Sequence, residues 1–102
     1  LDSMENALQA AEERQTKFVD AVSTTTDFPQ EKRSVKREQL LKVWFKAITQ
    51  YANPEVAEDH QASILQCCRH SLRVGTPSEQ YASCRVMEAL AVLVADENYY
   101  ND

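Results

Sequence analysis

Glycine is nearly absent from this sequence, since Gly75 is the only one among 102 residues. A loop that cradles phosphates needs several glycines, so the chain holds no glycine-rich nucleotide-binding motif. Long apolar runs are absent as well, and none approaches the roughly 20 residues that a membrane-spanning helix requires. We therefore expect neither a bound cofactor nor contact with a membrane.

Cysteine is scarce, and the three present, Cys67, Cys68 and Cys84, are an odd number that cannot complete a disulfide framework. Such usage is typical of a reducing compartment, and we expect an intracellular protein. Cys67, His70 and Cys84 are the only set of soft metal ligands, yet zinc needs four ligands and no CxxC pair exists. The sequence therefore predicts no metal site, and the cysteines are interpreted as small buried hydrophobic residues.

Motifs for catalysis are missing too. The chain has no nucleophile elbow, phosphate loop or paired-carboxylate motif, and Ser78 and Ser83 have no neighbouring base. His60 stands beside Glu58 and Asp59, a context that predicts a solvent-exposed histidine on a surface helix. We expect a protein that is not an enzyme.

Basic residues are outnumbered, because 11 Lys and Arg against 16 Asp and Glu give a net charge of −5. A nucleic-acid-binding domain usually carries a basic excess, so general attraction to phosphates is not expected. Four basic residues nevertheless gather at the start of one predicted helix, beside a loop: Lys32, Arg33, Lys36 and Arg37. They could contact phosphates or an acidic partner, or they could form an ordinary solvated helix face.

The main pattern in the sequence is the helical spacing of its apolar residues. Apolar residues recur at three- and four-residue steps, which predicts helices from Asp2 or Ser3 to about Val22, from between Pro29 and Ser34 to Tyr51, from Pro54 to about Arg73, and from Pro77 to about Ala95. Asn53-Pro54 divides the second helix from the third, because a residue that precedes proline is disfavoured in the helical region. A polar tail, 96–102, follows the last helix.

The clearest local signal lies between the last two helices. Gly75 can take the left-handed conformation that ends one helix, and Pro77 suits the first position of the next. The Thr76 hydroxyl can cap that next helix while Glu79 reaches back to the Thr76 amide, which is a capping box. So short a connection predicts an antiparallel helical hairpin.

The predicted fold is all-α and a single domain, 1–102, with about four helices. Two antiparallel hairpins, 1–52 and 53–95, suggest a repeat of about 40 to 50 residues, the length of armadillo and HEAT units. The last helix is apolar nearly all round toward its end, and such a helix needs cover on two sides. We expect that cover to come from a following helix or from another molecule, including self-association through this face.

Two segments carry a family resemblance: EKRSVKREQLLKVWFKAITQY, 31–51, and ILQCCRHSLRVGTPSEQYASCRVMEALAVL, 64–93. They resemble the N-terminal helical region of the interferon-related developmental regulator proteins. The shared features are a basic entry with a serine, a helix with leucine and aromatic positions, a basic-Leu segment, a glycine-containing turn and a Ser-Glu-Gln-x-Ala helix start. In this sequence they correspond to Lys32 to Arg37, Arg69 to Leu72 and Gly75 to Ala82.

The resemblance implies an armadillo-like scaffold without enzymatic activity. Members of the family are described as transcriptional co-regulators that engage histone-deacetylase complexes and as factors that associate with inactive ribosomes. The leading hypothesis is therefore a non-catalytic protein-interaction scaffold from a transcriptional co-regulator, binding other proteins through its helix faces. A ribosome- or RNA-associated translational regulator that uses the basic cluster is one alternative, and a helical subunit of an unrelated complex is another.

Overall fold

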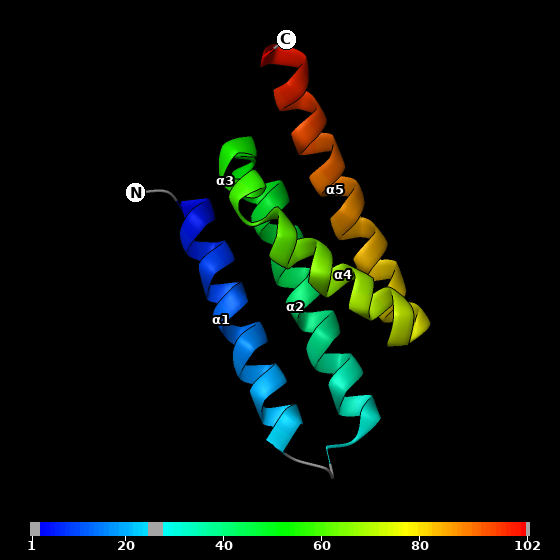
Figure 1. The fold of residues 1–102 in the computed structure, drawn as a ribbon. Coiled ribbons are helices and arrows are strands. Elements are labelled where there is room, and N and C mark those ends of the chain that lie inside the picture. The colour runs from blue at the N-terminus through cyan, green and yellow to red at the C-terminus, as the bar shows by residue number, and fades with distance from the viewer. Residues whose placement is uncertain (1–2, 25–27, 102) are drawn as a thin grey trace.

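The computed structural model describes residues 3–24 and 28–101. Within these ranges the chain forms five helices: α1 (Ser3–Thr24), α2 (Gln30–Tyr51), α3 (Pro54–Asp59), α4 (Gln61–Val74) and α5 (Pro77–Asn101). The predicted all-α class is confirmed (Figure 1). None of the helices in this part of the chain is long and apolar enough to cross a membrane.

Helix α2 is the centre of the arrangement. It packs against α1 as an antiparallel hairpin, and its most extensive contacts are with α5, which runs in the same direction beside it (Figure 1). Helix α4 crosses α2 and packs back on α5 after the tight turn at Gly75, so the second predicted hairpin is also present. In contrast, α1 has no extensive contact with α4, and these two helices diverge.

One hydrophobic core joins all five helices. Trp44 and Leu41 of α2 are fully buried at its centre, between Leu8 of α1, Ile64 of α4 and Val86 of α5. Because α2 contributes both a bulky indole and a row of aliphatic side chains, it buries apolar surface against every neighbour at once. This accounts for its central position.

The segment predicted as one helix from Pro54 to Arg73 is divided at His60. The backbone of His60 has φ −107° and ψ 4°, which ends α3 and starts α4. The prediction of an exposed His60 is also wrong, because its side chain is buried and Nδ1 lies 2.7 Å from Oε1 of Glu12 on α1. This long-range contact, which local periodicity cannot indicate, joins the break between α3 and α4 to α1.

The last helix continues past its predicted end at Ala95. Helix α5 extends to Asn101, through most of the segment that the sequence suggested as a polar tail, while Asp102 lies outside the described residues. The predicted boundary at Asn53-Pro54 is confirmed, since Asn53 caps α3 by accepting a hydrogen bond from the Val56 amide and Pro54 opens that helix.

The backbone conformations of Gly75 and Ala52 differ from what the sequence indicates. Gly75 has φ −87° and ψ 167°, so the predicted left-handed conformation is wrong. The left-handed helix end is instead at Ala52, with φ 44° and ψ 49°. Gly75 is required for space, because a Cβ atom there would collide with the Ser71 carbonyl oxygen and the Glu79 carboxyl group.

Substitutions at these two positions should change stability in opposite directions. Ala52→Gly relieves left-handed strain, partly offset by the greater chain entropy of glycine, and should raise the free energy of unfolding by up to about 1 kcal/mol. Gly75→Ala overpacks the turn and should lower it by about 1–3 kcal/mol. Urea unfolding followed by circular dichroism measures both, and a change of the same sign in the two variants would contradict this explanation.

Candidate functional site

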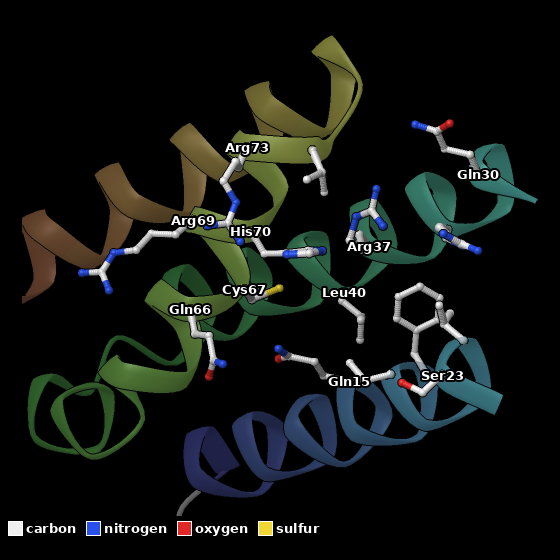
Figure 2. A pocket seen from close by; sticks show the side chains of 15 residues that line it. Gln15, Ser23, Gln30, Arg37, Leu40, Gln66, Cys67, Arg69, His70 and Arg73 are labelled. Atoms are coloured by element: carbon white, nitrogen blue, oxygen red, sulfur yellow. The ribbon is translucent and has the colours of Figure 1, made fainter. Parts of the chain in front are cut away.

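A groove lies between the two diverging helices, with α2 as its floor. Its volume is about 710 Å³, within the range of roughly 300–1,000 Å³ that is typical of ligand pockets. The lining side chains come from α1, α2 and α4, and Figure 2 shows several of them converging on the space between these helices. We call this space the basic groove, because four arginines are among its lining residues.

Arginine dominates the polar lining of the basic groove. Of the six arginines in the chain, four line it: Arg33 and Arg37 from α2, Arg69 and Arg73 from α4. His70 adds an imidazole, and no Asp or Glu is among the described lining residues. In Figure 2, His70 and Arg37 lie on facing sides of the groove, whereas Arg69 extends away from its centre. A domain with a net negative charge thus has a concave region of positive charge.

The α1 side of the groove is mainly apolar. Phe18, Val19 and Val22 line it there, and Leu40 of α2 adds apolar surface to the floor. Val19 is 51% exposed, and Phe18 packs edge to face on Phe28 with ring centroids 6.0 Å apart. The basic groove therefore combines an apolar side with a cationic side.

A smaller hollow of about 320 Å³ adjoins the basic groove and shares Gln15, Val19 and Gln66 with it. This second hollow carries the opposite charge, because Glu12 and Asp20 are among its lining residues. The surface between α1 and α4 is consequently polarised, with arginines in the larger hollow and carboxylates in the smaller one.

The four residues of the basic cluster predicted from the sequence lie in different environments in the structure. Lys32 and Lys36 are exposed and lie outside the basic groove, whereas Arg33 is half-buried and lines it. Arg37 is only 8% exposed and forms an ion pair with Glu79, Nε to Oε2 at 2.5 Å. The four residues therefore do not act as one exposed edge.

The predicted cap at the second turn is present in part. The Thr76 hydroxyl accepts a hydrogen bond from the Glu79 amide at 3.3 Å, and Pro77 is the first residue of α5, as expected. Glu79, however, does not serve the predicted capping box through its carboxylate. That carboxylate is fully buried and accepts hydrogen bonds from Arg37 and, at 2.7 Å, from the Ser34 hydroxyl.

Together these side chains form a buried polar network between α2 and α5. Since Ser34 donates to Glu79, the Thr76 hydroxyl donates to Ser34 Oγ over 3.0 Å. Burial alone would raise the pKa of Glu79, but the side chains of Arg37, Ser71 and Ser34 outweigh it, and the pKa lies below the usual value of 4.5. Glu79 is therefore ionised at neutral pH.

Cys67 and Cys68 have the character of packing residues, because both are buried in the hydrophobic core. Burial raises the pKa of the Cys67 thiol to about 11 and that of Cys68 to about 12, so both are protonated at neutral pH. The prediction that Cys84 is buried is wrong, because Cys84 is exposed on α5, apart from His70 and Cys67 at the groove. Within residues 3–24 and 28–101, no three His, Cys, Asp or Glu side chains are arranged to hold a metal ion.

Sequence reasoning missed the part that α4 plays in the groove. Arg69, His70 and Arg73 were recognisable as a basic last turn that suits the negative end of a helix dipole. Arg73 follows His70 by three residues and Arg69 by four, so it shares a helix face with each of them. What the sequence does not show is that this face lies opposite Arg33 of α2 across a hollow.

The helix arrangement defines a small all-α domain with a basic groove on one side. Residues 2–102 match the family model of the interferon-related developmental regulator (IFRD). Because the match covers almost the whole chain, the chain belongs to this family, and the resemblance seen in the sequence is confirmed. Neither curated proteins nor solved structures give a significant match.

Glu79→Gln should destabilise the domain by about 3 kcal/mol at neutral pH, since it leaves the Arg37 guanidinium buried without a counter-charge. The wild-type contribution has a defined pH dependence, because the folded-state pKa of Glu79 is lowered: it is fully present above pH 4.5 and is lost as the pH falls through the lower folded-state pKa. The variant should lose this dependence. Urea unfolding from pH 7 to pH 3 provides the measurement.

Glu88→Gln is the matched control for this experiment, since Glu88 is an exposed carboxylate on the same helix. It should leave stability within about 0.5 kcal/mol of wild type. If Glu79→Gln proved equally mild, the ion pair would not be a major support of the fold.

Proposed function

We propose that this chain is a non-catalytic protein-interaction module of a transcriptional co-regulator that works in the nucleus and cytoplasm. Its membership in the IFRD family carries the proposal, because that family is described as a developmental regulator. An armadillo- or HEAT-like stacking of the two hairpins would suit this role, since helical repeats bind partners along extended surfaces.

The surface of the domain supports a binding role. Several large apolar side chains are substantially exposed instead of joining the core: Val19, Val35, Tyr51, Val74, Tyr81 and Val92. Tyr81 and Val92 lie on α5, the helix whose apolar character led us to expect cover from another helix or molecule. Single exposed apolar residues are common, but those that adjoin the groove, Val19 and Val74, extend an already concave apolar surface.

The co-regulator role predicts association with histone deacetylases. An epitope-tagged chain immunoprecipitated from nuclear extract should recover deacetylase activity, measured on an acetylated histone peptide and abolished by a deacetylase inhibitor. The matched control is the Gly75→Ala variant, whose overpacked turn should reduce the folded fraction and the recovered activity together. Activity no greater than that of the tag alone would contradict the proposal.

A ribosome- or RNA-binding role is the second candidate, and the exposure of Lys32 and Lys36 favours it. Binding to a single-stranded RNA should then weaken with salt, and Lys32→Glu with Lys36→Glu should reduce the slope of log K against log salt by roughly 1.4, about 0.7 for each lost phosphate contact. Lys42→Glu with Lys46→Glu, exposed on the same helix, is the matched control. Fluorescence anisotropy measures both, and equal slopes for the two double variants would exclude the lysine pair as an RNA contact.

A further inference from the structure

We propose that the basic groove between α1, α2 and α4 binds an acidic amphipathic peptide segment of a partner protein. The inference deepens the proposed role as a protein-interaction module, and rests on it, by assigning the binding site and the chemistry of the partner. It uses the polarised surface between α1 and α4 rather than the exposed lysines of α2.

The unpaired positive charge of the lining side chains is the first reason to expect an acidic ligand in the groove. Arg37 is neutralised by Glu79, but Arg33, Arg69 and Arg73 have no ion-pair partner within residues 3–24 and 28–101. The Nε atom of Arg33 is shielded from solvent and has no hydrogen-bond partner in the same ranges. A shielded donor without a partner costs free energy, and a change in the Arg33 rotamer would present this donor to an incoming carboxylate. The groove is thus complementary to a group with several negative charges.

The apolar side of the groove distinguishes a peptide from other anions. A free phosphate would gain nothing from Val19, Val22 or Leu40, which line the groove beside the arginines. A single-stranded nucleic acid would need aromatic faces for base stacking, and the aromatic ring on this wall, Phe18, is half-buried and packed against Phe28. An amphipathic peptide presents an apolar stripe and a charged flank at once, which fits both sides of the groove.

The adjoining acidic hollow adds a constraint on the partner. Because Asp20 and Glu12 line the continuation of the groove, negative charges are favoured beside Arg33 and Arg73 and disfavoured at the other end. The preferred segment therefore has its acidic residues clustered toward one end and is neutral or basic toward the other.

The test uses the whole chain and a synthetic probe. The probe is a fluorescein-labelled, acetylated and amidated peptide with leucines at positions i, i+3, i+4 and i+7 and glutamates along its flanks, and fluorescence anisotropy measures its affinity. An isomeric peptide with lysines in place of the glutamates is the charge control. The acidic probe should bind and the basic one should not, and equal binding of the two would overturn the proposal.

Charge reversals at the two ends of the groove should act in opposite directions. Arg33→Glu with Arg73→Glu should weaken binding of the acidic probe at least about tenfold, since two charge-assisted contacts are lost. Asp20→Lys should strengthen it severalfold. The matched controls are Arg14→Glu and Glu13→Lys, which make the same kinds of charge change at exposed positions of α1 outside both hollows.

An apolar substitution tests the other side of the groove. Val19→Ser should weaken binding severalfold without loss of the helical circular dichroism spectrum, because Val19 is already half exposed and contributes little to the core. If Val19→Ser binds the probe as well as wild type and the charge reversals bind it as well as their matched controls, the groove is not the site and the inference fails.

Competition experiments separate the alternative ligands. Displacement of the probe by inorganic phosphate at the same concentration as unlabelled peptide would assign the groove to small anions, and tighter binding of a single-stranded RNA would assign it to nucleic acid. Either result overturns the inference. Recovery of deacetylase activity by the Arg33→Glu, Arg73→Glu variant at the wild-type level would overturn the groove as the co-regulator site while leaving the proposed function intact. Probe binding without deacetylase recovery would support the groove and contradict that function.

Discussion

The ion pair between Arg37 and Glu79 is the constraint on which the arrangement of the helices depends. It joins α2 to α5, the pair of helices with the most extensive contacts, and both side chains are buried. A buried charge is tolerated only when it is paired and hydrogen-bonded, so this pair accepts only a narrow range of positions for α5 on α2. Ser34 donates a further hydrogen bond to the Glu79 carboxylate, and Thr76 bonds both Ser34 and the Glu79 amide, which extends the constraint to the turn before α5.

The requirement for glycine at the turn follows from the same pair. In the position from which it reaches Arg37, the Glu79 carboxyl group lies close to the backbone of residue 75, where a Cβ atom would collide with it. The single glycine of the chain therefore leaves the space in which the charged Glu79 side chain is buried. The left-handed helix end at Ala52 shows that this fold accepts backbone strain elsewhere without a glycine.

Local patterns predicted the helices well and their long-range relations poorly. The all-α class, the Asn53-Pro54 boundary and the Thr76 cap follow from short-range stereochemistry, which the sequence displays directly. At the helix break His60 pairs with Glu12 of α1, and the buried Arg37 pairs with Glu79 of α5. Because those partners are distant in the chain, no periodicity could indicate them. The basic groove is missed for the same reason, since it exists only where α1 and α4 diverge over α2.

Arg33 and Arg37 show how one helix can serve stability and binding with the same residue type. They are one turn apart on α2, and both line the groove, but the Glu79 carboxylate pairs with Arg37 alone. Arg37 is thus committed to the fold, whereas Arg33 retains an uncompensated charge beside the apolar wall of α1. The positive potential of the groove therefore comes from Arg33 and the α4 arginines, and it can be altered at those positions without breaking the ion pair that holds α5 in place.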